Sequence, residues 1–161
     1  MVIVLETGTQ KFPFDRLVRA ADQIAAEHPG VTILAQTGTS TYTPTSMKSE
    51  AFISQEVMTE WVNSCDLVLT HGGTGSIVSA LKKSKHVVAV ARLSRYGEHV
   101  DDHQMEIIEE FDKDGLITGL TEFSKDSLWN AILKEMARPV QPYPDHHGDL
   151  INELKKRIDQ C

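Results

Sequence analysis

The stretch from Asp66 to Ser76 constrains the fold of this chain more than any other part of the sequence. A short apolar run leads through Thr70 and His71 into a glycine-rich turn, and apolar residues then recur at the spacing of a helix. A buried strand that ends in glycines and leads directly into a helix is typical of parallel α/β sheets, whose ligands bind at the carboxyl ends of the strands. This stretch therefore predicts that the chain folds around such a sheet.

The rest of the chain repeats the alternation of strand and helix. Strands are expected at residues 1–5, 31–35, 66–70, 87–91 and 115–119, with a further short strand at 51–53 after a polar loop at 39–49. Helices are expected at 15–27, from a Ser54 cap to about residue 65, after the glycines, around 105–111, and from a Ser124 cap to residue 136. The pattern predicts a doubly wound, Rossmann-like α/β fold with a parallel sheet covered on both faces.

The expected domain spans residues 1–138, and a proline-rich connector with a terminal segment follows at 139–161. Pro139, Pro142 and Pro144 interrupt helix formation. An amphipathic helix is then expected at 149–158, with its apolar stripe at Leu150, Ile151, Leu154 and Ile158. We expect this helix to pack either on its own domain or on a partner.

Composition excludes several classes of protein. A net charge of −7 and the absence of a long Lys/Arg run disfavour nucleic acid as a partner. No apolar run exceeds five residues, whereas a membrane-spanning helix needs about 20. The first residues lack the basic region of a signal peptide, and two cysteines form neither a disulfide framework nor a Cys-rich metal site. A cytoplasmic location is therefore expected.

The glycine-rich turn is a candidate anion site. Amides in the first turn of the following helix point outward, and the hydroxyls of Thr74 and Ser76 can add hydrogen bonds to a diphosphate. The alternative is a tight turn whose glycines only relieve steric crowding. The spacing matches neither a P-loop nor the Gly-x-Gly-x-x-Gly fingerprint, which disfavours a P-loop NTPase and an ordinary NAD site.

A second polar loop, residues 92–104, follows the next strand and is expected at the same edge of the sheet. Its candidates are Arg92 or Arg95 to neutralise a diphosphate, and Asp102, His103 and Gln104 to bind sugar hydroxyls. A solvated loop with a capping aspartate is the alternative. A third interpretation is a metal site built from His99, Asp101, Asp102 and His103, with a similar cluster at 145–149, but we expect no metal at either place.

These motifs together resemble a known family. The motifs are Thr70-His71-Gly72-Gly73-Thr74-Gly75-Ser76, Tyr96-Gly97-Glu98-His99 and Asp102-His103-Gln104. They resemble the donor-binding half of glycosyltransferase family 28, and most of all the small subunits of split enzymes, the Alg13 group and its bacterial capsule and exopolysaccharide counterparts. The likeness extends to about Phe111 and also includes Thr7-Gly8-Thr9, Phe14-Asp15-Arg16-Leu17 and Gln36-Thr37-Gly38.

The resemblance implies a GT-B carboxyl-terminal half that binds a UDP-sugar without a metal. It also implies an inverting hexosyltransferase that is active only with a membrane-anchored, Alg14-like subunit, which holds a lipid-linked acceptor for polysaccharide biosynthesis. Such a chain would be peripheral to the membrane through that partner. A length of 161 residues suffices for one Rossmann-like half but not for two, which favours a split enzyme independently.

Residue roles carry over motif by motif. His71, Gly75 and Ser76 would contact the diphosphate, His103 and Gln104 the donor sugar, and Gly8 and Thr9 would line the cleft between the two halves. The complete set of expected donor-binding residues is Gly8, Thr9, Gln36, Thr37, Gly38, His71, Gly72, Gly73, Thr74, Gly75, Ser76, Arg92, Asp102, His103 and Gln104. The general base is expected on the partner, with His71 as the candidate on this chain.

One position departs from the family pattern. Many relatives carry a glutamate for the ribose hydroxyls at the position of Ser79, and a serine cannot accept two hydrogen bonds as a carboxylate does. Two other functions remain open at this point: a regulatory module that senses a nucleotide sugar without catalysis, and a metal-dependent phosphohydrolase. The sequence does not specify the sugar, so galactose, glucose, glucuronic acid and N-acetylglucosamine are all open.

Overall fold

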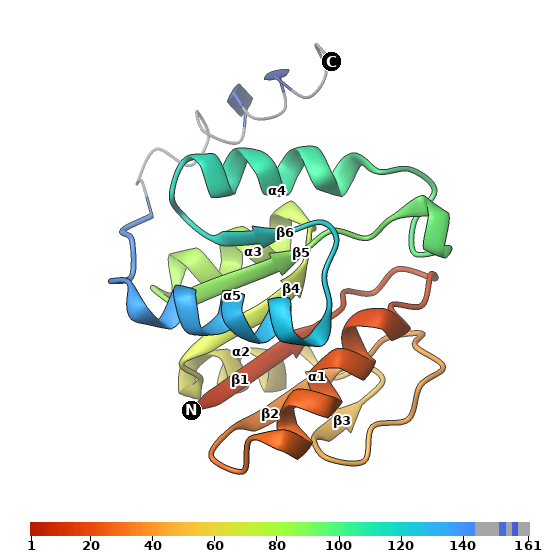
Figure 1. The fold of residues 1–161 in the computed structure, drawn as a ribbon. Coiled ribbons are helices and arrows are strands. Elements are labelled where there is room, and N and C mark those ends of the chain that lie inside the picture. The colour runs from red at the N-terminus through yellow and green to blue at the C-terminus, as the bar shows by residue number, and fades with distance from the viewer. Residues whose placement is uncertain (144–151, 154–155, 158–161) are drawn as a thin grey trace.

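The computed structural model describes residues 1–143, 152–153 and 156–157, and these are built around a six-stranded parallel sheet (Figure 1). The strand order is β3-β2-β1-β4-β5-β6, and every neighbouring pair is parallel. The strands are β1 (Val2–Glu6), β2 (Thr32–Gln36), β3 (Lys48–Glu50), β4 (Leu67–His71), β5 (His86–Val90) and β6 (Thr118–Leu120). The predicted doubly wound fold is confirmed.

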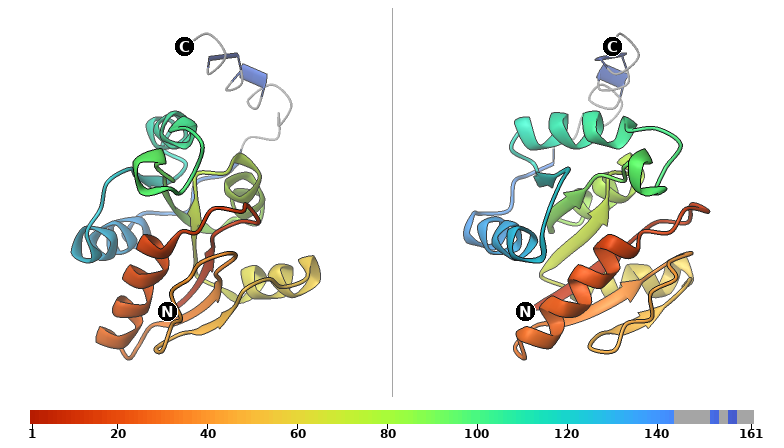
Figure 2. Two further views of the ribbon diagram at one scale, coloured as in Figure 1. Left: turned by 90° about the vertical axis from the view of Figure 1, so that its right-hand side faces the viewer. Right: turned by 45° about the vertical axis from the view of Figure 1, so that its right-hand side comes forward.

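Helices cover both faces of the sheet (Figures 1 and 2). One core cluster joins one face to α1 (Asp15–Glu27) and α5 (Lys125–Ala137), and a second joins the other face to α2 (Gln55–Ser64), α3 (Thr74–Lys82) and α4 (His103–Lys113). Successive strand residues point to opposite faces, so in β4 Leu67 and Leu69 belong to the first cluster and Val68 to the second. The central strands are therefore mostly apolar on both faces up to their carboxyl ends, as in other buried parallel sheets.

Two helix starts follow the predicted caps. The Ser54 hydroxyl accepts a hydrogen bond from the Val57 amide at 3.2 Å, and Ser124 forms a reciprocal capping box with Ser127. These bonds satisfy amides that have no partner within the first turn of a helix. The predicted starts of α2 and α5 are confirmed.

The third strand was predicted at the wrong place. It spans Lys48–Glu50, which begins inside the polar loop expected at 39–49, and not residues 51–53. Lys48 and Glu50 are exposed, because this edge strand pairs only with β2 among the described strands. Main-chain pairing in register, Leu34 with Lys48 and Gln36 with Glu50, defines the strand, and such pairing leaves no apolar signal in the sequence.

The strand order reverses between β1 and β4. From β1 the chain crosses through α1 to β2 on one side, and from β4 it crosses through α3 to β5 on the other. The loops that leave β1 and β4 therefore diverge and open a crevice at the carboxyl edge, the right-hand side of the sheet in Figure 1. This is where the candidate residues of the glycine-rich turn and of the loop after β5 lie.

The structure tests only part of what was predicted for the carboxyl-terminal segment. Helix α5 ends at Ala137, next to the boundary expected at residue 138. All four apolar positions of the expected helix at 149–158, and the cluster at 145–149, lie outside the described residues. Among the described residues, no helix has the length and apolar character needed to cross a bilayer.

Candidate functional site

His71, at the end of β4, is the centre of the crevice. Its side chain is buried between two glycines, Gly8 after β1 and Gly73 before α3. A Cβ atom at Gly8 would lie 2.6 Å from the His71 Nε2 atom, and a Cβ at Gly73 would lie 2.3 Å from the Cε1 atom. Both positions must therefore be glycine for the imidazole ring to sit here, and Gly8 also has a positive φ of 78°.

Gln104 of α4 fixes the protonation of this ring. Its Oε1 atom accepts hydrogen bonds from the amides of Gly72 and Arg92, at 3.0 and 3.1 Å. The Nε2 atom of the amide is thereby directed at the His71 Nδ1 atom, 3.2 Å away, and can only donate to it. Burial, followed by the charges of Arg92 and His99, lowers the pKa of His71 to about 4. The ring is therefore neutral near pH 7 and carries its proton on Nε2.

A line of polar groups continues from that nitrogen. The His71 Nε2 atom is 3.5 Å from the Ser76 hydroxyl in the first turn of α3, and this hydroxyl donates to the Oε1 atom of Glu6 at 3.0 Å. Burial raises the pKa of Glu6, while the Ser76 hydrogen bond and the Lys83 charge act in the opposite direction. Four elements, α4, β4, α3 and β1, thus place one polar line across the switch point of the sheet.

The start of α3 presents main-chain amides beside this line. Helix α3 begins at Thr74, with Gly73 as its N-cap, and no side chain in the part of the chain that the structure describes caps it. A Cβ at Gly75 would meet nothing within 4 Å, so the turn is open on its outer side. Uncapped amides and the helix dipole favour an anion at such a terminus. The arrangement can bind a phosphate group through backbone amides and the His71 Nε2–H, and through the Ser76 hydroxyl when it turns from Glu6 to a phosphate oxygen.

The family can be assigned at this point. The whole stretch from residue 2 to residue 161 matches the family model described as "Glycosyltransferase family 28 C-terminal domain". The chain belongs to this family. The family resemblance seen in the motifs is thereby confirmed.

Individual relatives agree with the assignment. The chain is 27% identical, over 125 residues, to the UDP-N-acetylglucosamine transferase subunit ALG13 of Yarrowia lipolytica, a match that covers 68% of this chain and 60% of that protein. The chain therefore spans about 60% of the length of this curated relative. Two solved structures share the fold at 17% identity. The match to the ALG13 NMR structure has a TM-score of 0.61 and covers 95% of this chain and 93% of that chain. The match to the calicheamicin glycosyltransferase CalG4 has a TM-score of 0.66 and covers 99% of this chain and 38% of that chain.

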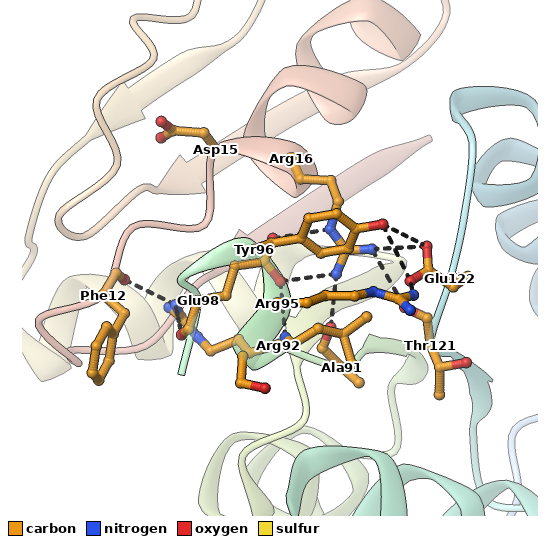
Figure 3. Close-up of polar contacts among 12 residues, drawn as sticks. Phe12, Asp15, Arg16, Ala91, Arg92, Arg95, Tyr96, Glu98, Thr121 and Glu122 are labelled. Atoms are coloured by element: carbon orange, nitrogen blue, oxygen red, sulfur yellow. Dashed lines mark hydrogen bonds and ion pairs between the residues drawn. The ribbon is translucent and has the colours of Figure 1, made fainter. Parts of the chain in front are cut away.

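In this family 28 domain, Arg92 lies elsewhere than its expected role requires. Its guanidinium is buried, stacks on the ring of Phe14 at 4.8 Å and donates to three main-chain carbonyl groups, of which those of Phe12 and Glu98 are drawn in Figure 3. The Nη1 atom donates to the carbonyls of Phe12 and Glu98 at 2.9 and 3.1 Å, and the Nη2 atom donates to that of Thr7. These donors are taken up within the protein, so Arg92 ties the loop after β1 to the loop after β5 and does not itself face a diphosphate.

A second group of hydrogen bonds ties the start of α1 to the loop after β5. Arg16 of α1 donates from Nε and Nη2 to the two carboxylate oxygens of Glu98, both at 2.9 Å, and from Nη2 to the Ala91 carbonyl (Figure 3). Glu98 is buried and also accepts from the Leu93 amide at 2.9 Å. We did not single out Arg16 or Glu98 from the sequence as supports of the site. The signal was present, since each belongs to one of the motifs that carry the family resemblance.

The three candidates at the start of α4 have different surroundings. Asp102 accepts from the amide and hydroxyl of Ser94, at 2.8 and 2.9 Å, and these bonds lower the pKa of its carboxyl. His103 is exposed, with its Nδ1 atom 3.7 Å from Glu106. Gln104 points inward and its amide is engaged as described above, so a positioning role replaces the sugar contact expected for it.

The candidates after β2 shape the edge of the crevice. Three hydrogen bonds join the end of β2 to the end of β3 and the residues after it. The Gln36 side chain accepts from the Ile53 amide, the Thr37 hydroxyl donates to the Glu50 carbonyl, and the Gly38 amide donates to the Ala51 carbonyl. Thr9 is exposed in the loop after β1, and Thr7 links this loop to the Gln36 carbonyl at 3.0 Å. These residues hold the two loops side by side at the carboxyl edge.

The third interpretation of the loop after β5 was a metal site. The described residues contain no group of three or more His, Cys, Asp or Glu side chains that could hold a metal ion. The His99 Nδ1 atom lies 3.2 Å from Asp101, and the His103 Nδ1 atom lies 3.7 Å from Glu106.

Proposed function

We propose that this chain is the donor-binding subunit of an inverting glycosyltransferase and binds the diphosphate of a UDP-sugar at the start of α3. The observation that carries the proposal is the convergence of uncapped helix amides, the Ser76 hydroxyl and the His71 Nε2–H at the switch point of the sheet. Membership of the glycosyltransferase family 28 C-terminal domain supports it.

These groups suit the departure of a nucleoside diphosphate. Transfer of the sugar breaks its bond to the diphosphate, which leaves with increased negative charge. The helix amides at the start of α3 already point at this position and stabilise the charge without reorganising during the reaction, and the Ser76 hydroxyl joins them when it exchanges its Glu6 acceptor for a phosphate oxygen. Since they are helix amides, a hydroxyl and a neutral imidazole, we propose that the reaction on this chain proceeds without a metal ion.

His71 serves as a donor in this scheme and not as the general base. A base must offer a lone pair to the acceptor hydroxyl, whereas Nδ1 already accepts from Gln104 and Nε2 carries the proton. We therefore place the base on a second, membrane-anchored, Alg14-like subunit that holds a lipid-linked acceptor for polysaccharide biosynthesis. The similarity to the ALG13 subunit supports a two-component enzyme, and we place this chain in the cytoplasm at the membrane through that partner.

Two measurements test the proposal. Calorimetric titration with UDP, with and without EDTA, is expected to show binding that survives chelation. Transfer from a panel of radiolabelled UDP-sugars to a lipid extract is expected only when the chain is co-expressed with its partner subunit. Binding of UDP without any partner-dependent transfer would instead indicate a regulatory module that senses nucleotide sugars.

Variants of the proposed donors sharpen the test. Removal of one donor to a developing anion lowers turnover by about 10²–10³, so Ser76→Ala and His71→Ala are each expected to lower turnover by about that factor. The exposed helix residue Glu109 on α4 is a control, and Glu109→Gln should not change the rate. Retention of wild-type turnover by both donor variants would contradict the proposed site.

A further inference from the structure

A cavity runs along α3 from the candidate phosphate site. It has a volume of about 240 Å³ and extends from Ser76, in the first turn, past Ser79 to Lys83 at the end of the helix. Helix α2 forms its opposite wall through Gln55 and Met58. Pockets that hold complete drug-sized ligands measure about 300–1,000 Å³, so this cavity suits one part of a nucleotide that is anchored at the start of α3.

The carboxylate of Glu6 reaches this cavity from the end of β1. Among the described residues, Ser76 provides its one hydrogen bond, at 3.0 Å to Oε1. A carboxylate can accept about four hydrogen bonds, so most of the acceptor capacity of Glu6 is unused by the protein. A partly buried carboxylate in this condition is costly unless a ligand or water supplies donors.

A second unsatisfied group lies next to it. Thr70 is the register partner of Glu6 across the β1–β4 pair, so the two side chains project from the same face of the sheet. The Thr70 hydroxyl is fully buried and has no hydrogen-bond partner in the described part of the chain. Two polar side chains with unmet hydrogen bonds thus project from neighbouring strands on the face of the sheet that α3 covers, whereas the apolar Met58 side chain lines the cavity wall formed by α2.

The chemistry of the ligand follows from these groups. A carboxylate accepts and cannot donate, so its complement is a pair of adjacent donors, and the 2′- and 3′-hydroxyls of a ribose have this arrangement. A carboxylate is the usual group for ribose hydroxyls beside a pyrophosphate site in α/β folds. Ser79 lines the same cavity but offers one hydroxyl and no carboxylate.

We propose that Glu6 recognises the ribose of the nucleoside diphosphate by accepting hydrogen bonds from its 2′- and 3′-hydroxyls. This inference rests on the proposed binding of a nucleoside diphosphate at the start of α3. It assigns the nucleoside to the cavity between α2 and α3, with Gln55 and Met58 facing the base.

The test compares three ligands by calorimetry on the full chain: UDP, 2′-deoxy-UDP and inorganic pyrophosphate. The wild-type chain should bind UDP about tenfold or more tightly than 2′-deoxy-UDP, since a hydrogen bond to a charged acceptor contributes about that much. Glu6→Gln, a substitution of nearly equal shape, should weaken UDP binding by about tenfold to a hundredfold and remove this preference. Pyrophosphate, which lacks a ribose, should bind the variant at least as tightly as the wild type.

Two further variants complete the design. Glu56→Gln removes the same charge from an exposed position on α2 and should leave all three affinities unchanged. Adding Ser79→Glu to Glu6→Gln returns a carboxylate to the same cavity and should restore at least part of the preference for UDP over 2′-deoxy-UDP.

The outcomes separate the two proposals. If Glu6→Gln keeps the wild-type ratio of UDP to 2′-deoxy-UDP affinity while UDP and pyrophosphate bind normally, the role of Glu6 is wrong and the proposed phosphate site stands. If the wild-type chain binds neither UDP nor pyrophosphate, the proposed function and this inference both fail.

Discussion

Acid should destabilise this domain through His71, and the size of the effect follows from its burial. The pKa of His71 is about 4 in the folded chain, against an ordinary value of 6.5. Between these values the unfolded chain binds the proton and the folded chain does not, so the free energy of unfolding falls as the pH is lowered from 6.5 to 4. At about 1.4 kcal/mol per pH unit, the difference corresponds to about 3 kcal/mol over the window and about 2 kcal/mol by pH 5.

Urea denaturation between pH 7 and pH 4.5 measures this loss. With a slope of about 1–3 kcal/mol per molar urea, a loss of about 2 kcal/mol lowers the midpoint by about 1 M at pH 5. His71→Asn removes the titrating ring but keeps an oxygen that can accept from Gln104, and the variant should lose less stability over the same range. Protonation of Glu6 changes the free energy of unfolding in the opposite direction, because burial raises the pKa of its carboxyl. The quantity to compare is therefore the difference in stability between the wild type and the variant at each pH.

A matched control isolates the buried ring from histidines in general. His103 is exposed at the start of α4, so His103→Asn removes a histidine without touching the buried ring, and its pH dependence of stability is measured beside that of His71→Asn. The reasoning would be refuted if wild type and His71→Asn lost stability in parallel between pH 7 and pH 5.

Three further predictions test the supports of the site. Gly73→Ala should lower stability by about 1–3 kcal/mol and abolish UDP binding, since its Cβ would overlap the His71 ring. Gly30→Ala, whose Cβ meets nothing within 4 Å, should change neither the thermal unfolding temperature nor the UDP affinity measured by calorimetry. Glu98→Gln should cost about 1–3 kcal/mol by leaving Arg16 without its carboxylate, and equal stability of the variant would argue against this contribution of the Arg16–Glu98 contact. Gln104→Glu should raise the pKa of His71 and place a proton on Nδ1, which nitrogen NMR of the ring detects; an unchanged Nε2–H tautomer at neutral pH would show that Gln104 does not control it.

The fold could be predicted from the sequence because its signals are local. The apolar strands near 66–70 and 87–91, the glycines after a strand and the cap at Ser54 can each be recognised within a window of a few residues. The edge strand β3 could not be predicted, since main-chain pairing with β2 defines it and its exposed side chains carry no periodic pattern.

The sequence was enough to predict where the site lies but not the role of each residue in it. The motif at 70–76 located the crevice at the carboxyl edge, where the structure brings it together with Gly8 and Gln104. Residue type alone suggested that Arg92 binds an anion, but two of its three carbonyl partners, Thr7 and Phe12, lie in a loop about 80 residues earlier in the chain. Long-range hydrogen bonds of this kind leave no spacing that a sequence pattern can reveal.

The most direct test of the account is a titration of the isotopically labelled chain with UDP, followed through its backbone amide resonances. We expect the largest shifts at residues 72–77, together with a shift of the His71 Nε2–H signal as it donates to a phosphate oxygen. Saturable shifts confined to another part of the chain, with the amides at the start of α3 unchanged, would contradict the claim that this turn holds the diphosphate.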